Sequence, residues 1–409
     1  MKKYLYIVLL VGVFSCKSTN IEPKLKTQLP ENVGPYSNKL KKMEKNINNF
    51  VDEGKIPFVQ AAIIKDNELI HFHSYGYGDI ESKTKVNENS IFRIYSMTKP
   101  IVSVAIMILI ERGVINLDDK VKNYIVDFED LVVFNDSLDF KKPKADINIS
   151  DLLSHKSGFG YGWGSNSYID SMYSNIWENK NNEDFVKDLI DIPLYFDPKT
   201  SWRYGVSTDV LGYLIEVVTG QPLYNFLYEN IFDPLQMYDT SFQISKKKIN
   251  RFVSNYQFDE NKNKLDKVDD WEKTRYRKVT MHSGGGGLIS TTFDYINFCL
   301  MLSNNGSFNG ITILTPESIG LMTKNQIGSI NYPWDEGVKF GYGFSVVTDQ
   351  GLSELRDSNG SFGWSGAAGT RFTIDPEKKL ILLLMTQRMH PWSGVWKVFN
   401  DMTYLSLIE

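Results

Sequence analysis

Cysteine is almost missing from this sequence. Only Cys16 and Cys299 occur among the 409 residues, so a framework of several disulfide bonds is excluded. Histidine is also scarce, with five residues, and no Cys-x-x-Cys pair and no close pair of histidines with a cysteine predicts a zinc site. We therefore expect chemistry that uses neither a metal nor another cofactor.

An excess of either charge is missing too. Lys and Arg number 45 and Asp and Glu number 49, so no net field draws the chain to nucleic acid, and we expect no nucleic-acid partner. Hydrophobic residues make up 42% and charged residues 23%, the balance of an ordinary globular protein. The length exceeds that of one compact core, which indicates two domains or one two-lobed unit.

The sequence has one apolar run at its start, and this run is too short to span a bilayer as a helix. Residues 5–14 follow Lys2 and Lys3 and precede Ser15-Cys16, the order of an export signal. The last residues of the run resemble a bacterial lipobox, so we predict a lipoprotein signal peptide over 1–15, a lipidated Cys16 and a polar tether over 16–37. A plain signal peptide is the alternative. With the lipid on Cys16, the exported protein is expected at a bacterial cell envelope, anchored on its periplasmic or surface side.

Apolar periodicity beyond the tether predicts a fold built from both ends of the chain. A helix is expected over 40–51, a hairpin over 58–65 and 68–75 with its turn at Asp66-Asn67, and strands over 344–347, 371–374 and 380–385. Strong helices are expected over 101–112 and 210–218 and from about 395. The predicted class is α/β, in the two-lobed α+β sense: an antiparallel sheet flanked by helices, with an inserted, mostly helical lobe.

The predicted boundaries follow from this pattern. The domain should cover 38–405, with a sheet lobe over about 38–95 and 281–409 and a helical lobe over about 96–280, and a site is expected in a cleft between them. His71 and His73 alternate on one strand face, which we interpret as solvated because no third ligand is near. Cys299 falls on an apolar helix face and is expected to be an inert core thiol.

The segment most informative about chemistry is Ile94-Tyr95-Ser96-Met97-Thr98-Lys99-Pro100. Proline is tolerated in the first turn of a helix, so a helix should begin close to Ser96. Ser96 and Lys99, three residues apart, would then touch, and the positive end of the helix would favour an alkoxide and an oxyanion. Taken alone, the pair is better explained by a capping serine and a solvated lysine than by a catalytic pair.

Three further segments follow in chain order. They are Leu-Leu-Ser-His-Lys-Ser-Gly at 152–158, Trp-Arg-Tyr-Gly-Val-Ser-Thr-Asp-Val-Leu-Gly at 202–212, and Ser283 with four glycines and Leu-Ile-Ser-Thr up to 291. Together with the segment around Ser96, they resemble the serine β-lactamase and penicillin-binding-protein superfamily, most of all its class C and carboxylesterase-like branch. The resemblance spans roughly residues 38–405.

The resemblance implies a β-lactamase/transpeptidase-like fold and an acyl-enzyme on Ser96. It assigns the family's catalytic tyrosine to Tyr204, makes His155 structural, and makes the glycines at 284–287 a flexible link into the sheet lobe. A tyrosine needs a nearby cation to act as a base near neutral pH, and Lys99 would supply it. Either Lys99 or Tyr204 can take the first proton.

The segment at 362–370 lies where the family has its third motif, which in β-lactamases and penicillin-binding proteins is Lys-Thr-Gly. Here Trp364, Ser365 and Gly366 stand at those positions, as in the carboxylesterase-like members. We therefore expect these three residues to contact the substrate without offering it a cation. Arg371, on the next predicted strand, would replace that cation if it pointed toward the site.

Backbone groups and aromatic side chains complete the predicted site. The N–H groups of Ser96 and Ala367 are expected to form the oxyanion hole. Trp163 is expected to contact substrate, in a loop whose aromatic residues either line the site or pack within the lobe; these are Tyr161, Trp163, Tyr168 and Tyr173.

Three functions compete at this stage. Hydrolysis of small carboxylic esters by a serine hydrolase is favoured, because the missing lysine would otherwise hold a substrate carboxylate. A D-amino-acid peptidase, penicillin-binding or β-lactam-hydrolysing enzyme is the first alternative. A non-catalytic binding protein on the same fold is the second, and the presence of Ser96, Lys99 and Tyr204 argues against it. The expected partners are a small ester or peptide substrate and, through the lipid anchor, a membrane.

Overall fold

The computed structural model describes residues 37–135, 139–164, 167–177, 181–268, 275–389 and 393–407. The predicted signal peptide, Cys16 and all but the last residue of the predicted tether lie outside these ranges. The helices of the described residues are α1 (Ser37–Asp52), α2 (Thr98–Glu111), α3 (Ile149–Leu153), α4 (Ser167–Met172), α5 (Asn182–Ile190), α6 (Ser207–Thr219), α7 (Leu223–Leu227), α9 (Thr292–Ser303), α10 (Pro316–Met322) and α11 (Val395–Leu407). None of them combines the length and the apolar character needed to cross a membrane.

Strands from both ends of the chain form the main sheet. Its order is β12-β13-β14-β15-β16-β1-β2-β3, with antiparallel pairing throughout. These strands are β1 (Phe58–Lys65), β2 (Glu68–Asp79), β3 (Thr84–Lys85), β12 (Val338–Phe340), β13 (Ser345–Val347), β14 (Phe362–Ser365), β15 (Arg371–Asp375) and β16 (Leu380–Met385). The pairing of β1 with β16 joins the two chain ends, as the sequence predicted.

Shorter strands tie loops to this frame. Phe92–Arg93 (β4), just before Ser96, pairs with Ile289–Ser290 (β9). The others are β5 (Val133–Asn135), β6 (Asp139–Lys141), β7 (Tyr256–Asp259), β8 (Lys264–Lys267), β10 (Ser307–Phe308), β11 (Ile311–Thr312) and β17 (Arg388–Met389). The β5–β6 and β7–β8 pairs fall inside the block that the sequence predicted to be mostly helical.

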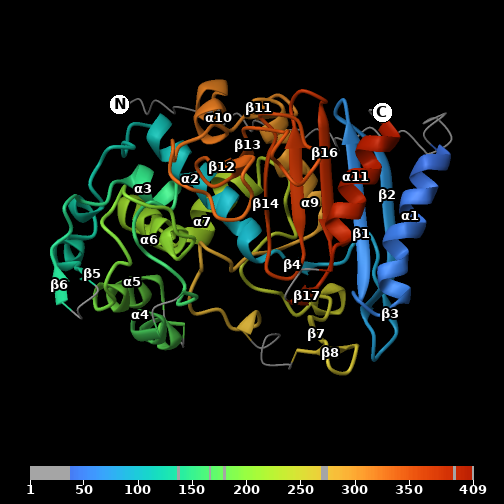
Figure 1. Ribbon diagram of the computed structural model, residues 1–409, viewed down its shortest axis with the longest axis horizontal. Helices are drawn as coiled ribbons and strands as arrows, with labels where there is room; N and C mark the ends of the chain where they lie inside the picture. The colour runs from blue at the N-terminus through green and yellow to red at the C-terminus, as the bar shows by residue number, and fades with distance from the viewer. Residues whose placement is uncertain are drawn as a thin grey trace, which may run out of the picture.

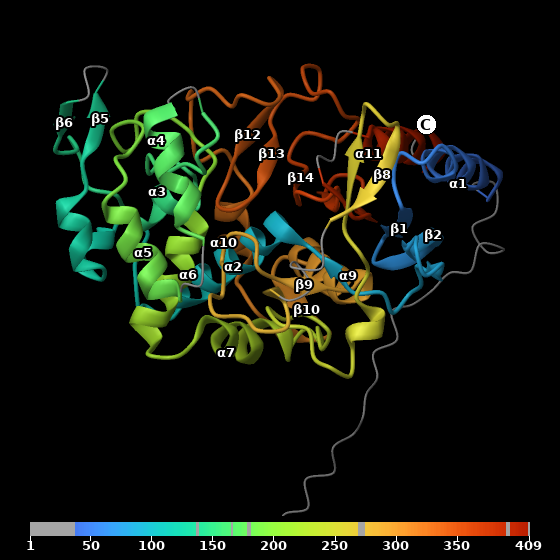
Figure 2. The same ribbon diagram turned by 90° about the horizontal axis from the view of Figure 1, so that it is seen from below.

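Alternation along the central strands separates two cores. On β1, Ala61 and Ile63 face a core shared with α1 and α11, whereas Ala62 and Ile64 face the larger core that includes α2 and α9. Figure 2 shows α1 and α11 on one side of β1 and β2 and α9 on the other. Figure 1 shows α3 to α6 gathered at the end of the molecule opposite α1 and α11. The sheet is therefore covered on both faces.

The predicted hairpin is confirmed, including its turn. Asp66 and Asn67 connect β1 and β2 with φ angles of 52° and 65°. Two successive residues at positive φ make the turn that best matches the twist of paired strands, and Asp and Asn tolerate this conformation. The local sequence was therefore sufficient to place the hairpin.

The predicted solvated face of β2 is wrong. His71 is 5% exposed, and its Nε2 lies 3.7 Å from Glu44 Oε1, while His73 Nε2 lies 2.8 Å from Asn48 Oδ1. Burial and the neighbouring His73 lower the pKa of His71 to about 4. Glu44 and Asn48 lie four residues apart on α1, so the polar side of this helix, and not solvent, covers the histidines.

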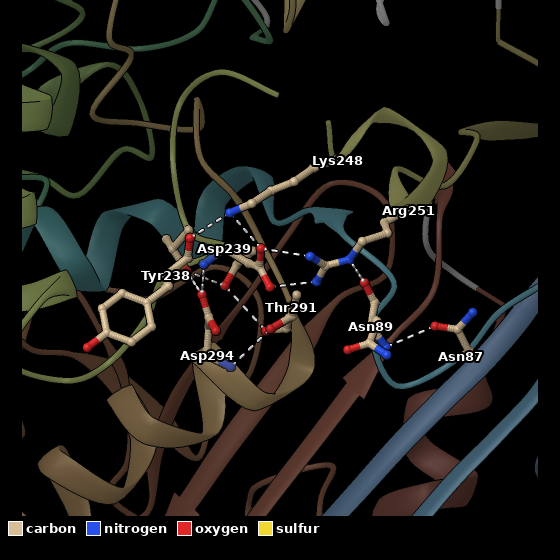
Figure 3. Close-up of polar contacts among 10 residues, drawn as sticks. Asn87, Asn89, Tyr238, Asp239, Lys248, Arg251, Thr291 and Asp294 are labelled. Atoms are coloured by element: carbon tan, nitrogen blue, oxygen red, sulfur yellow. Dashed lines mark hydrogen bonds and ion pairs between the residues drawn. The ribbon is translucent and has the colours of Figure 1, made fainter. Parts of the chain in front are cut away.

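A polar network fixes the loop before β7 to the start of α9 (Figure 3). Arg251 donates two hydrogen bonds to the Asp239 carboxylate, at 2.9 and 2.5 Å, and Lys248 Nζ lies 2.8 Å from the same group. Asp294, in the first turn of α9, accepts a hydrogen bond from the Asp239 N–H at 2.8 Å. Arg251 also donates to the Asn89 carbonyl at 2.7 Å, which extends the network to the segment leading into β4.

We predict that Arg251→Met lowers the free energy of unfolding at neutral pH by about 1–3 kcal/mol, the range for hydrogen bonds to charged groups. Burial acts to raise the pKa of Asp239, but the hydrogen bonds from Arg251 and Lys248 lower it overall from 3.8. A carboxylate with a lowered folded-state pKa contributes stability above its unfolded value and loses that contribution as the pH falls through the folded value.

Denaturant unfolding should therefore show the difference between wild type and variant shrinking when the pH is lowered to about 3. Arg277, which is exposed, offers the matched control, and Arg277→Met should change stability by no more than about 0.5 kcal/mol. A difference for Arg251→Met that is equally large at both pH values would contradict the ion-pair assignment.

Candidate active site

Ser96 lies in a single 3-10 turn, Tyr95–Met97, between β4 and α2. Thr98 begins α2, and Pro100 falls in the first turn, so the predicted helix start is confirmed to within two residues of Ser96. Tyr95, just before the serine, has a φ of 43° and its hydroxyl accepts a hydrogen bond from Asn255 at 2.9 Å. Positive φ is uncommon outside glycine and is concentrated at functional sites.

Lys99 is fully buried, and its amine contacts three oxygen acceptors. Nζ lies 3.4 Å from Ser96 Oγ, 2.8 Å from the Tyr161 hydroxyl and 2.6 Å from the Gly285 carbonyl. An ammonium has three N–H donors, so these acceptors match it completely. Ser96 itself is partly exposed, which leaves its hydroxyl accessible to a substrate.

The glycine-rich segment holds one of these acceptors by close packing. A Cβ on Gly284 would lie 2.4 Å from the Thr208 carbonyl, and a Cβ on Gly285 would lie 2.2 Å from Asp209 Oδ2. The Gly285 N–H donates to Asp209 Oδ1 at 3.0 Å. The segment is therefore a packed part of the site, and the interpretation as a flexible link is wrong, because only glycine fits at these positions.

The two tyrosines beside Lys99 play different parts. The Tyr161 hydroxyl accepts a hydrogen bond from Lys99. Burial, followed by the charges of Asp209 and Tyr204, raises the pKa of Tyr161 well above 10. Tyr204 presents its ring face, with Lys99 Nζ 4.5 Å from the centroid, and its buried hydroxyl has no hydrogen-bond partner among the described residues. Tyr204 is thus next to Lys99, as predicted, and Tyr161 is the contact that the sequence did not assign.

His155 is a packing residue. Its ring is buried and lies 5.0 Å from that of Tyr204 and 5.4 Å from that of Phe340. Burial, followed by the charge of Lys99, lowers its pKa well below 6.5, so it is neutral. It packs behind Tyr204 without contacting Ser96, in line with the structural role expected for it.

Tyr204 is enclosed by aromatic rings from several parts of the chain. Trp334 and Trp364 each lie 5.4 Å from its centroid, and Trp202 lies at 6.4 Å. Trp334 remains half exposed, so it presents an apolar edge to solvent beside the buried rings. Trp334 was missed from sequence, since it stands in a loop without a recognisable motif.

The turn after β14 lies against the nucleophile segment. A Cβ on Gly366 would lie 2.4 Å from the Ile94 carbonyl, so glycine is required for this approach. The neighbouring Ala367 N–H, predicted for the oxyanion hole, has no hydrogen-bond partner within the described part of the chain. Trp364 is buried against Tyr204, and Ser365 is exposed at the end of the strand.

Arg371 does not replace the missing cation. It pairs across the sheet with Leu384, a residue of the core beneath α1 and α11. Its guanidinium lies 4.9 Å from the ring centroid of Trp396 on α11. The condition under which Arg371 would hold a substrate carboxylate is therefore not met.

The aromatic loop after His155 divides between the two predicted roles. Tyr161 contacts Lys99, and Trp163 stacks on Tyr161 at 5.0 Å and is largely exposed. Tyr173 is buried and accepts a hydrogen bond from the Gly160 N–H, and Tyr168 packs on Phe134. Two of the four residues therefore lie at the site, and the other two support the lobe.

Comparisons with known proteins agree with this geometry. The sequence profile of the family described as Beta-lactamase matches residues 43–395. Protein Rv1367c of Mycobacterium tuberculosis is 30% identical over 356 residues, covering 84% of this chain and 88% of that protein. Esterase EstB of Burkholderia gladioli is 27% identical over 350 residues, covering 80% and 84%.

The fold is matched by a solved structure as well. EstCE1, described as a hydrolase with promiscuous acyltransferase activity, superposes with a TM-score of 0.81 at 23% identity, over 90% of this chain and 99% of that one. The family profile spans far more than half of the sequence. The chain therefore belongs to the β-lactamase family, as one of its serine hydrolases.

Proposed function

We propose that this protein hydrolyses small neutral carboxylic esters through an acyl-enzyme on Ser96. The observation that carries the proposal is the set of groups around the nucleophile. A lysine amine lies beside Ser96 Oγ, and aromatic rings stand where a cation for a substrate carboxylate would be. The arginines nearest in sequence to Trp364 and Tyr204 do not supply this cation. The Arg371 guanidinium lies over the Trp396 ring, and the Arg203 guanidinium lies over the Tyr195 ring. The likeness to esterase EstB supports the same substrate class.

The reaction would proceed in two steps. Ser96 Oγ attacks the ester carbonyl, its proton passes to Lys99 as the neutral amine or to Tyr204 as the phenolate, and the N–H groups of Ser96 and Ala367 stabilise the oxyanion. As the carbon–oxygen bond to the alcohol breaks, the alcohol takes that proton. Water then attacks the acyl group, releases the acid and restores the Ser96 hydroxyl.

The first test removes the nucleophile. Ser96→Ala should leave no more than about a thousandth of the wild-type ester turnover, the scale seen when nucleophiles are removed. Lys99→Ala and Tyr204→Phe should each cause a comparable loss, and their double variant should lose little more, because both serve one proton network. Turnover of nitrophenyl esters and labelling by a fluorophosphonate probe measure these effects.

Tyr161→Phe is the matched control for Tyr204→Phe, since each removes the hydroxyl of a tyrosine that contacts Lys99. It deletes only an acceptor, so its loss should be the smaller of the two. A larger loss for Tyr161→Phe would move the proton-transfer role to Tyr161, and additive losses for Lys99 and Tyr204 would reduce Tyr204 to a packing residue.

The second test concerns substrate charge. A charge-assisted hydrogen bond contributes about 1.5–3 kcal/mol, so a site without that cation should favour a neutral ester over a matched carboxylate-bearing ester about ten- to a hundredfold in kcat/KM. Cephalosporins and penicillins, which carry the carboxylate, should be hydrolysed slowly or not at all.

Arg371→Ala supplies the control for this selectivity and should leave it unchanged, because the guanidinium contacts α11. Efficient β-lactam turnover that collapses in this variant would replace the esterase assignment with that of a carboxylate-binding enzyme.

We also propose that the protein is anchored in a bacterial envelope membrane through lipid on Cys16, which rests on the order of charged, apolar and small residues before it. The intact mass should correspond to a chain that begins at Cys16 and carries acyl chains. Cys16→Ala should move the protein out of the membrane fraction. Membrane association that survives this substitution would exclude the anchor.

A further inference from the structure

Asp209 is a buried carboxylate that the proposed reaction does not use. It lies in the first turn of α6, five residues after Tyr204, and is 2% exposed. Its Oδ1 accepts hydrogen bonds from the Ser283 hydroxyl at 2.6 Å and from the Gly285 N–H at 3.0 Å. Its Oδ2 is buried with no hydrogen-bond partner among the described residues. A buried carboxylate with one oxygen lacking a hydrogen bond is costly unless a nearby positive charge stabilises it.

Gly285 connects this carboxylate to Lys99. Its N–H binds Asp209, and its carbonyl accepts the hydrogen bond from Lys99 Nζ at 2.6 Å. A Cβ on Gly285 would lie 2.2 Å from Asp209 Oδ2 and 2.9 Å from the Tyr161 hydroxyl, so both groups crowd against the same backbone. Asp209 therefore fixes the backbone that positions one of the three acceptors of Lys99.

Lys99 and Asp209 also carry opposite charges. Lys99 is fully buried, and among the described residues the hydrogen bonds of its Nζ go to neutral oxygens of Ser96, Tyr161 and Gly285, not to a carboxylate. A buried charge is costly unless an opposite charge and hydrogen bonds compensate for it. Burial raises the pKa of Asp209, and the charge of Lys99 acts in the opposite direction, so the two groups interact across Gly285.

We propose that Asp209 is the buried counter-charge of Lys99 and, through Gly285, a positioning residue for the acyl transfer on Ser96. The inference rests on the proposed function for its kinetic consequences, whereas the charge pairing stands on the packing alone. Asp209 reaches Lys99 without a direct salt bridge, so Lys99 keeps its three N–H groups for Ser96, Tyr161 and Gly285.

A pH dependence follows from this arrangement. The titratable groups around the pair are Lys99, Tyr161, Tyr204 and His155, and Arg275 also acts on the carboxylate. A negative charge opposes the loss of a proton from each neighbouring acid. Removing it should therefore move both the acidic and the alkaline limb of the kcat/KM profile to lower pH, whichever group takes the first proton.

Asp209→Asn tests the charge while keeping the shape of the side chain. We expect kcat/KM to fall about ten- to a hundredfold, since small displacements of reacting groups have effects of this size, and both limbs to shift to lower pH. Ser283→Ala removes one donor to the carboxylate but keeps the charge, so its limbs should stay at their wild-type positions.

Asp294→Asn is the matched control. Asp294 is also a buried carboxylate in the first turn of a helix, and it accepts a hydrogen bond from the Asp239 N–H (Figure 3). It accepts a second one from the Thr240 hydroxyl. It contacts none of the residues around Ser96, so its variant should keep the wild-type pH profile. A wild-type profile and kcat/KM in Asp209→Asn would overturn the proposal.

A stability cycle with Lys99→Met tests the charge pairing without any activity. Because Asp209 compensates the charge of Lys99, Asp209→Asn should shift the unfolding midpoint less in the Lys99→Met background than in wild type, even if the single variant folds poorly. Equal shifts in both backgrounds would overturn the pairing. If only the proposed function were wrong, the Ser96→Ala variant would hydrolyse esters as fast as the wild type, while the stability cycle would still show the charge pairing.

Discussion

The burial of the Lys99 amine is the constraint on which the rest of the site depends. A cation that is fully removed from water needs an acceptor for every N–H, and here these come from Ser96, Tyr161 and Gly285, residues far apart in sequence. The pairing of β4 with β9 aligns the segments of Ser96 and Gly285. This two-stranded pairing, which is separate from the main sheet, is thereby a requirement of the chemistry as well as of the fold.

Glycine is the means by which these segments approach each other. Gly285 touches Asp209 and Tyr161, and Gly366 touches the Ile94 carbonyl, each at distances that a Cβ would prevent. Both approaches position backbone close to the nucleophile segment: the Gly285 carbonyl accepts from Lys99, and the turn at Gly366 packs on the carbonyl of Ile94, two residues before Ser96. A mutation at either glycine would therefore change the position of a reacting group before it changed the stability of the fold.

Local patterns in the sequence predicted what local physics determines. The turn at Asp66-Asn67 and the helix start before Pro100 follow from backbone preferences, and both are confirmed. The environment of His71 was predicted wrongly, because the helix that covers it lies in another part of the sequence. The contacts of Tyr161 with Lys99 and of Asp209 with Gly285 arise only when distant segments pack together, so the motifs located the site without revealing its polar network.

The tryptophan at position 364 is consistent with this electrostatic balance. Lys99 already lies 4.5 Å from the ring centroid of Tyr204, and Trp364 packs against the same ring. A second cation at that position would be buried beside the first, whose charge Asp209 already compensates. Like charges at this separation in a poorly solvated environment repel strongly. Neutral rings around Tyr204 avoid that repulsion, and the same choice removes the group that would select a charged substrate.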